Sequence, residues 1–329
     1  MIPALAATVF REYGLTGSWT LVPSDWGSHP RYVLRTGDDC YFVKGKPEYL
    51  DDREYADAVS FQAAMSDAGA PTPPVRRTRG GRLVAQTGSG PFSIQSWLSG
   101  AVPWPSKRLA SEVGTAYGRF SAISRSVRTA AASGLSRPQA RAHLFPDSPA
   151  SFRTYFARHL PKLNRYGVSP HLIDSVGARV GEELLLASVP ELPLEWIAGD
   201  AHPANTLVAD RTVTLVDCDN ARVATRVWSI ASYAAALGAV DDVCGAAGVY
   251  RVASRWDTDA MLAFVEGFEG VEPLDSSERA VLAPLIRLAL CVLTLASTNV
   301  DDDDSPTPAD VPDTVAVTLR LLSMPAPPL

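Results

Sequence analysis

Cysteine is scarce in this 329-residue chain, and the few thiols show no metal-binding or disulfide pattern. The cysteines are scattered, and no two of them form a C-x-x-C pair; they are Cys40, Cys218, Cys244 and Cys291. This spacing excludes a zinc knuckle and a disulfide framework as the basis of the fold.

Three further signals are missing from the sequence. There is no G-x-x-x-x-G-K-[ST] motif, so the chain is not a P-loop nucleotide-binding protein. No uninterrupted apolar run approaches the roughly 18 to 20 residues that span a bilayer. The N-terminal residues lack the positive region of a signal peptide and predict a short helix that ends at Gly14. We therefore expect a cytoplasmic protein without a membrane partner.

The composition is that of a soluble globular enzyme, with 46% hydrophobic and 20% charged residues. The length allows one large or two modest domains with a buried core. A net charge of −6 argues against a nucleic-acid partner and is compatible with a cationic small-molecule substrate. Both a monomer and a homodimer are compatible with the sequence.

The most informative stretch is residues 196–220, WIAGDAHPANTLVADRTVTLVDCDN. Asp200, His202 and Asn205 fall within six residues, and a later apolar run ends on Asp217, followed by Asp219. Alternation over residues 205–208 and 212–216 predicts two short strands joined as a hairpin.

A hairpin brings the loop before its first strand close to the end of its second strand. Three carboxylates and an amide would then share one side of a small ribbon, and these are the hard oxygen ligands that Mg²⁺ prefers. Like charges gathered in this way need a shared cation or proton. The alternative is that Asp200 and Asp217 are ordinary turn and cap residues.

This stretch closely resembles the catalytic region of the aminoglycoside phosphotransferase and choline kinase superfamily. These small-molecule kinases are built like protein kinases and carry the pattern H-G-D-x-H-x-x-N, then a strand and I-D-x-D/E. The chain has matching residues in register at Gly199, Asp200, His202, Asn205, Asp217 and Asp219.

The resemblance implies a role for each of these residues. Asp200 would be the catalytic base beside the substrate hydroxyl, and His202 would brace the loop. Asn205 and Asp217 would hold Mg²⁺ on the nucleotide phosphates, with assistance from Asp219.

Two positions depart from the family pattern. The usual His two residues before the catalytic Asp is Ala198, and the Asp that begins the following D-L-A helix is replaced by Ser229. Both positions orient the catalytic loop in protein kinases, so the departures bear on loop rigidity and not on the type of reaction.

Residues 1–100 are expected to form the N-terminal nucleotide-binding lobe, in which residues 15–100 predict several strands with one helix. Strands are expected at residues 18–22, 31–35, 40–44, 82–85 and 92–98, and a further strand near Val75 is left open. A helix is expected from Asp51 or Asp52 to about residue 67. Strands, a helix and more strands in this order predict a five-stranded sheet plus a helix, as in the nucleotide-binding lobe of a kinase.

Lys44 lies near the end of the third strand in the segment F-V-K. In kinase-like folds a lysine at this place contacts the α- and β-phosphates and is held by a glutamate on the next helix. Glu54 is the natural partner, although Glu48 and Asp52 compete with it and Lys46 could replace Lys44. The alternative is that Lys44 is a solvated lysine and Glu54 a helix-dipole acid.

Two further segments are expected to contact the nucleotide. The loop over residues 23–30 falls where a phosphate-covering loop belongs, and Ser28 and its backbone N–H groups could cradle phosphate. Gln95, Ser96 and Trp97 resemble the family's hinge, where the backbone pairs with adenine or guanine. Trp97 could flank the base or belong to the core.

Residues 101–329 predict a mainly helical lobe that carries the catalytic hairpin and the acceptor site. Helices are expected at residues 107–123, 151–160, 170–187, 226–238, 240–247, 257–268, 276–295 and 313–322. The expected fold is therefore α+β and bilobal like a protein kinase, with a small antiparallel-sheet N-lobe and a larger, mainly helical C-lobe.

The predicted activity is transfer of the γ-phosphate of ATP or GTP to a hydroxyl of a small molecule, with Mg²⁺ as the cofactor. By family analogy, the first choice of acceptor is an antibiotic of the aminoglycoside, peptide or nucleoside type. A metabolic kinase for choline, homoserine or a sugar is the alternative. A catalytically weak nucleotide-binding pseudokinase is the third reading, motivated by Ala198 and Ser229.

Overall fold

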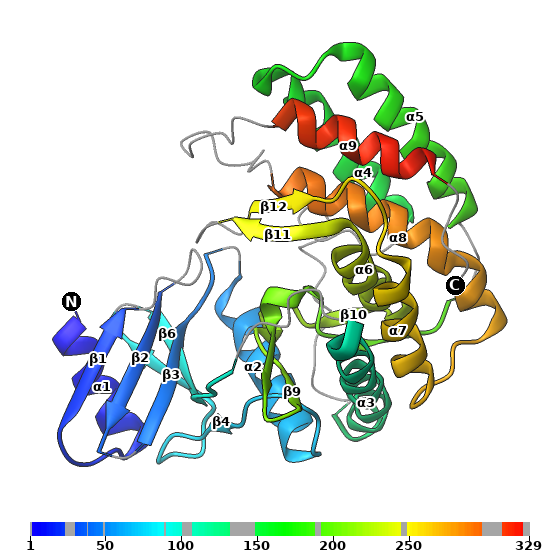
Figure 1. Ribbon diagram of the computed structural model, residues 1–329. Coiled ribbons are helices and arrows are strands. Elements are labelled where there is room, and N and C mark those ends of the chain that lie inside the picture. The colour runs from blue at the N-terminus through cyan, green and yellow to red at the C-terminus, as the bar shows by residue number, and fades with distance from the viewer. Residues whose placement is uncertain are drawn as a thin grey trace.

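The chain folds into an antiparallel sheet region followed by a larger helical region, as Figure 1 shows for this computed structural model. The structure describes residues 2–23, 30–37, 39–48, 50–88, 90–100, 107–131, 149–187, 192–244, 249–297 and 311–324. This architecture confirms the predicted α+β fold class.

The N-terminal sheet has the strand order β1-β2-β3-β6-β4, with β5 also paired to β6. All of its pairings are antiparallel. The two-residue strand near Val75 is present, so the sheet has six strands and the predicted number of five is wrong. The strands are β1 Trp19–Pro23, β2 Arg31–Thr36, β3 Asp39–Gly45, β4 Val75–Arg76, β5 Val84–Thr87 and β6 Gly90–Ser96.

The alternation of β3 and β6 assigns their side chains to two faces of the sheet. Tyr41, Val43 and Ile94 belong to a core cluster with helix α1 (Ile2–Tyr13). The other face carries Lys44 and Ser93. The Ser93 hydroxyl on this face is hydrogen-bonded to Tyr55 of helix α2 (Asp52–Asp67). The face toward α1 is therefore apolar, whereas the opposite face carries Lys44 and Ser93 toward the rest of the molecule.

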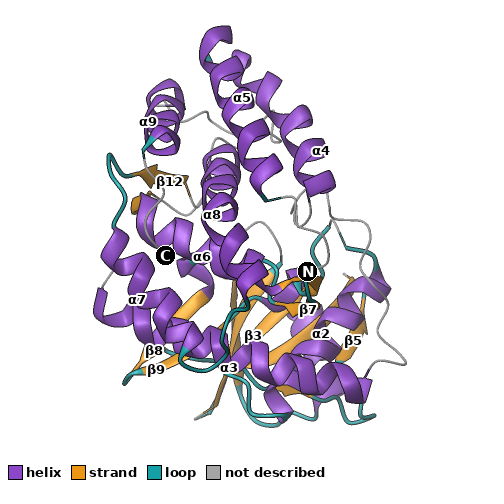
Figure 2. Ribbon diagram, turned by 90° about the vertical axis from the view of Figure 1, so that its right-hand side faces the viewer, coloured by secondary structure: helices purple, strands orange, loops and turns teal. Residues whose placement is uncertain are grey.

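The helical region is built around α6 (Arg226–Ala239), whose residues are almost all buried. It packs against α7 (Thr258–Glu269) and α8 (Ser276–Ser297), and α3 (Lys107–Ala131) packs closely on α7. A Cβ at Gly114 of α3 would lie 2.0 Å from the Phe264 carbonyl oxygen, so glycine permits this close crossing. Figure 2 shows α4 (Pro149–His159), α5 (Pro170–Leu186) and α9 (Val311–Ser323) at the end of the molecule away from the N-terminal sheet.

Residues 240–247 were expected to form a helix, and this prediction is wrong. Val240–Cys244 forms strand β11, which pairs antiparallel with β12 (Val249–Val252). Val240 and Val243 are β-branched residues, which favour strands, and the run starts where α6 ends. Residues 245–248 lie outside the described part of the chain.

Helix α8 is long and apolar enough over Ser276–Ala296 to cross a membrane by length and composition. It is the sole such helix within the described residues, and 72% of its most apolar window is buried inside the protein. Its neighbours are α5, α6 and α9, so its apolar surface is used in packing. This is the pattern of a core helix.

Candidate active site

A cavity of about 420 Å³ lies between the N-terminal sheet and the predicted hairpin. The sheet region and the hairpin both contribute to its wall. The lining residues are Arg31, Phe42, Lys44, Pro73, Gln95, Ser96, Trp97, Leu98, Ser99, Gly100, Ala204, Asn205, Leu207, Val216 and Asp217. The predicted nucleotide-binding residues Lys44, Gln95, Ser96 and Trp97 thus line the same cavity as Asn205 and Asp217.

The predicted hairpin is present as β8 (Thr206–Ala209) and β9 (Thr212–Leu215). Beyond its last paired residues, the Val216 N–H donates to the Asn205 carbonyl at 2.9 Å. This bond fixes the start of the hairpin beside its end. It therefore brings the loop that contains Asp200 and Asn205 alongside Asp217.

A second, unpredicted ribbon flanks this loop and the Asp217 turn in the chain. Strand β7 (Leu194–Ile197) pairs with β10 (Arg222–Thr225), and the chain leaves β7 directly into Gly199 and Asp200. Gly199 has a φ of +86°, and a Cβ there would lie 1.8 Å from the Asn220 carbonyl oxygen. The position requires glycine because both the left-handed backbone and the close approach of the following loop exclude a side chain.

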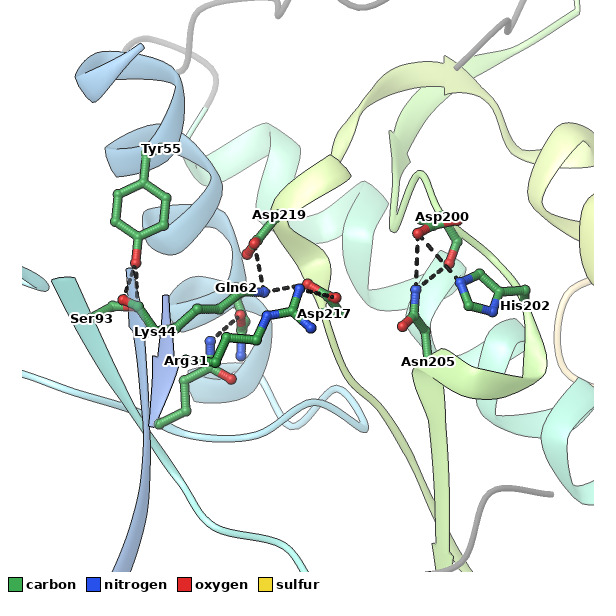
Figure 3. Close-up of polar contacts among 11 residues, drawn as sticks. Arg31, Lys44, Tyr55, Gln62, Ser93, Asp200, His202, Asn205, Asp217 and Asp219 are labelled. Atoms are coloured by element: carbon green, nitrogen blue, oxygen red, sulfur yellow. Dashed lines mark hydrogen bonds and ion pairs between the residues drawn. The ribbon is translucent and has the colours of Figure 1, made fainter. Parts of the chain in front are cut away.

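Asp200 is held by its own loop. Asn205 Nδ2 donates to the Asp200 backbone oxygen at 3.0 Å and to Oδ2 at 3.2 Å, and His202 Nε2 lies 3.4 Å from the same Oδ2 (Figure 3). Burial raises the pKa of Asp200, but His202 and the Asn205 amide outweigh this and leave the pKa below its ordinary value. The carboxyl of Asp200 is therefore ionised at neutral pH.

Asp217 is held by two cations from the sheet (Figure 3). Its Oδ2 accepts from Arg31 Nη2 at 3.0 Å, and its Oδ1 accepts from Lys44 Nζ. Burial raises the pKa of Asp217, but Lys44 and then Arg31 overcome this and hold the pKa well below its usual range. The backbone of Asp217 is also left-handed, with a φ of 62°.

Asp219 is the second partner of Lys44, with 2.5 Å between Oδ2 and Nζ. Asp219 is 3% exposed, and burial raises its pKa more than Lys44 lowers it. The ammonium of Lys44 thus lies between two carboxylates from one turn of chain, Cys218–Asn220 and its N-cap.

The predicted pairing of Lys44 with Glu54 is wrong for this structure. Glu54 lies in the first turn of α2 and forms a capping box, in which its carboxylate accepts from the Asp51 N–H and its own N–H donates to Asp51. Lys44 is 1% exposed and pairs with Asp217 and Asp219. The neighbouring Tyr55 is the α2 residue that contacts Lys44, because its hydroxyl donates to the Lys44 carbonyl.

The apolar end of the cavity lies at the predicted hinge. Trp97 is 41% exposed and lines the cavity, and its ring centroid lies 6.3 Å from that of Phe42. Of the two earlier interpretations of Trp97, the structure favours a side chain at the cavity over one in the core. Ser28 lies outside the described residues.

The donor atoms fit a divalent cation that is shared with phosphates. Within the described chain, no group of three or more His, Cys, Asp or Glu side chains could hold a metal by itself, so a metal here would need further ligands. Asp217 and Asp219 supply carboxylate oxygens, and Asn205, whose Nδ2 faces Asp200, has its Oδ1 left to act as a ligand. Mg²⁺ commonly takes one or two carboxylates together with substrate phosphates, and this set suits that mode.

Two arginines of the site were missed from the sequence. Arg31 lies directly opposite Lys44 in the β2–β3 pairing, and the turn between these strands could have revealed this register. Arg222 is 2% exposed, and its Nη1 donates to the Gly199 carbonyl at 2.9 Å and the Asn220 carbonyl at 3.3 Å. The signal in the sequence was an arginine directly after the D-x-D-N-A run, where its side chain could reach back to the backbone of the loop.

The two residues that depart from the family pattern are both buried. Ala198 and Ser229 are both 7% exposed, and the Ser229 hydroxyl has no hydrogen-bond partner within the described chain. Two hydrogen bonds from Arg222 tie the Gly199 turn to the loop after Asp217.

Comparisons with known proteins agree with this geometry. A model of the phosphotransferase enzyme family matches residues 18–264. A search of curated proteins returned no match to the chain.

Several solved structures share the fold of the whole chain. An aminoglycoside phosphotransferase from Alicyclobacillus acidocaldarius has a TM-score of 0.64 at 15% identity, covering 96% of this chain and 92% of its own. An amicoumacin kinase in complex with AMP-PNP and Ca²⁺ has a TM-score of 0.64 at 13% identity, covering 99% and 94%. A microcompartment-associated aminopropanol kinase has a TM-score of 0.63 at 16% identity, covering 98% and 96%.

Proposed function

This chain belongs to the phosphotransferase enzyme family, and from that premise we propose that it moves the γ-phosphate of ATP or GTP to a hydroxyl of a small molecule. The observation that carries the proposal is the single cavity lined by Lys44, Asn205, Asp217 and the hinge residue Trp97. The Lys44 ammonium matches the phosphates of a nucleotide, Asn205 and Asp217 match its metal ion, and the aromatic side chain of Trp97 matches its base.

In the proposed reaction, Asp200 is the catalytic base. The acceptor oxygen attacks the γ-phosphorus, the bond to the β–γ bridging oxygen breaks, and the nucleoside diphosphate leaves with that electron pair. The Asp200 carboxylate takes the hydroxyl proton late, because the transition state of phosphoryl transfer is loose. Its pKa, held low by His202 and Asn205 against the effect of burial, keeps the carboxylate ready to accept.

Asn205, Asp217 and Asp219 are proposed to hold Mg²⁺. When bound, the ion would neutralise phosphate charge as a Lewis acid. Lys44 and Arg31 already lie against Asp217, and from there they would contact the phosphates. Catalysis then depends mainly on positioning and charge neutralisation.

The acceptor is proposed to be a hydroxylated antibiotic of the aminoglycoside, peptide or nucleoside type. The structural relatives support this choice, since they include an aminoglycoside phosphotransferase and an amicoumacin kinase. The aminopropanol kinase among them favours a second candidate, phosphorylation of a small metabolic alcohol such as choline, homoserine or a sugar. The net charge of −6 suits a cationic acceptor in either case.

The test is a screen of hydroxylated antibiotics and metabolites with γ-labelled ATP and GTP in the presence of Mg²⁺. Label on an antibiotic supports the first candidate, and label on a metabolic alcohol supports the second. Nucleotide binding without transfer to any of a broad panel would identify a pseudokinase. A protein that binds neither nucleotide would overturn the proposal.

A further inference from the structure

Two buried amide side chains form a hydrogen-bonded relay that ends at the cavity wall. Gln62 of α2 donates through Nε2 to the Pro73 carbonyl at 3.1 Å. Gln95 of β6 donates through its own Nε2 to Gln62 Oε1, also at 3.1 Å. Gln62 is 2% and Gln95 4% exposed, and Gln95 lines the cavity.

The chemistry of the relay fixes the orientation of both amides. The Pro73 carbonyl can only accept, so Gln62 must turn its NH₂ group toward it and its oxygen toward Gln95. Gln95 must then meet that oxygen with its NH₂ group. Its Oε1 is thereby directed away from Gln62, and no N–H or O–H group within the described chain donates to it. The cavity wall therefore carries a hydrogen-bond acceptor of fixed position.

The sheet register places this acceptor at the base end of the cavity. Gln95 lies opposite Phe42, and Ser93 lies opposite Lys44, so Phe42, Lys44 and Gln95 share one face of the sheet. The two pairs are two residues apart, which is about 7 Å along the strands. Phosphates at Lys44 leave the purine beside Phe42, Trp97 and Gln95.

We propose that the Gln62–Gln95 relay makes the enzyme select an adenine nucleotide over a guanine nucleotide. Adenine carries an amino group at position 6 that can donate to Gln95 Oε1, whereas guanine carries an oxygen there. Two acceptors facing each other at a buried site leave both unpaired. The inference rests on the proposed function, because it assumes that a nucleotide occupies this cavity.

The first test needs no variant. Calorimetric titration of the wild-type protein with ATP, purine riboside triphosphate and GTP, each with Mg²⁺, compares an amino group, hydrogen and oxygen at position 6. ATP is expected to bind at least about tenfold more tightly than GTP, with purine riboside triphosphate between them. Equal affinities for ATP and GTP would overturn the inference and leave the proposed function standing. Binding of none of the three would overturn the proposed function instead.

The second test changes Gln62, which takes part in both hydrogen bonds of the relay but does not line the cavity. Gln62→Met removes both hydrogen bonds of the relay, including the one that orients Gln95, so the Gln95 amide can turn over and present its NH₂ group to guanine. The ratio of ATP to GTP affinity should then narrow toward one. A folded Gln62→Met protein with the wild-type ratio would contradict the role of the relay.

Ser93→Ala provides the matched control. The Ser93 hydroxyl is hydrogen-bonded to Tyr55 at 2.8 Å, so it is another buried contact between β6 and α2, and Ser93 is not among the cavity-lining residues. This variant should keep the wild-type ratio of ATP to GTP affinity. A ratio that narrows equally in both variants would show general loosening of α2 and overturn the specific role of Gln62.

Discussion

At the scale of single residues, Asp200 and Asp217 are two carboxylates of one site with different surroundings. Asp200 is bound by His202 and Asn205 from its own loop, and Asp217 by Lys44 and Arg31 from the distant sheet. Under the proposed assignment, one faces the acceptor and the other the metal and nucleotide.

Substitution of the two aspartates should therefore affect different properties, turnover for Asp200 and nucleotide affinity for Asp217. Asp200→Asn should lower turnover about 100- to 10,000-fold, the range expected for loss of a general base, and leave nucleotide affinity unchanged. Asp217→Asn should weaken binding of the Mg²⁺–nucleotide more than about tenfold. Calorimetry and a transfer assay on both proteins separate the two effects. Near-full activity of Asp200→Asn would refute its assignment as the base.

Arg222 ties the Gly199 turn to the loop after Asp217 through two buried hydrogen bonds. Arg222→Met would leave the Gly199 and Asn220 carbonyls without their buried donor, and should lower the free energy of unfolding by about 2 kcal/mol or more. Urea denaturation measures this loss. The exposed Arg53→Met is the control and should change stability by less than about 0.5 kcal/mol. Equal effects of the two substitutions would remove Arg222 from this role.

At the scale of elements, α2 begins with a capping box, and its Tyr55 donates a hydrogen bond to the Lys44 carbonyl. Asp51→Ala should destabilise the protein by about 1 kcal/mol, the usual value of an N-cap, as measured by urea denaturation. Glu54→Gln, which keeps the capping oxygen, should leave both stability and nucleotide affinity nearly unchanged. A large loss of nucleotide affinity in Glu54→Gln would restore the Lys44–Glu54 pairing that this structure does not show.

Strand β7 carries a buried acid shortly before the loop that contains Asp200. Glu195 is 3% exposed and accepts from the Ser121 hydroxyl. Burial raises its pKa to about 7, although Ser121, Arg226 and Arg125 lower it, while Glu272 raises it further. The folded protein therefore binds a proton at Glu195 that the unfolded chain releases near its ordinary pKa.

This difference predicts a pH-dependent stability. The contribution of Glu195 is fully present below about pH 4 and is lost as the pH rises to about 7, with a total of about 3 kcal/mol. Glu195→Gln should remove that part of the slope, as followed by urea denaturation from pH 4 to pH 8. An unaltered slope in the variant would show that Glu195 is ionised throughout.

At the scale of the whole molecule, the cavity joins the N-terminal sheet to the helical region. Arg31, Lys44 and the hinge come from the first, and Asn205 and Asp217 from the second. A nucleotide bound there would contact both regions and stabilise them together.

Binding should therefore raise the stability of the entire chain. At about 100 times its Kd, a Mg²⁺–nucleotide should add about 2.7 kcal/mol to the free energy of unfolding. Differential scanning calorimetry should show the shift in every unfolding transition, with a smaller shift for the Asp217→Asn protein at the same nucleotide concentration as the control. A shift confined to one transition would place the ligand within a single region.

The sequence by itself determined the fold class, the hairpin and the pattern of Asp200, Asn205 and Asp217. These features are local, since strand alternation, turn residues and motif spacing act within a few residues. Local sequence likewise narrowed the α2 N-cap to Asp51 or Asp52, and the structure has it at Asp51. The family follows from the same stretch.

Only the tertiary structure decided which groups meet across the cavity. Lys44 and Asp217 are 173 residues apart, and Arg31 and Asp217 are 186 apart, so no local period encodes their pairing. The strand at residues 240–244 and the β7–β10 ribbon also depend on distant partners, which packing selects and propensity does not. Lys44 is bound to Asp217 and Asp219 instead of Glu54 because two carboxylates, one of them buried, stabilise an ammonium more than one partly exposed acid does.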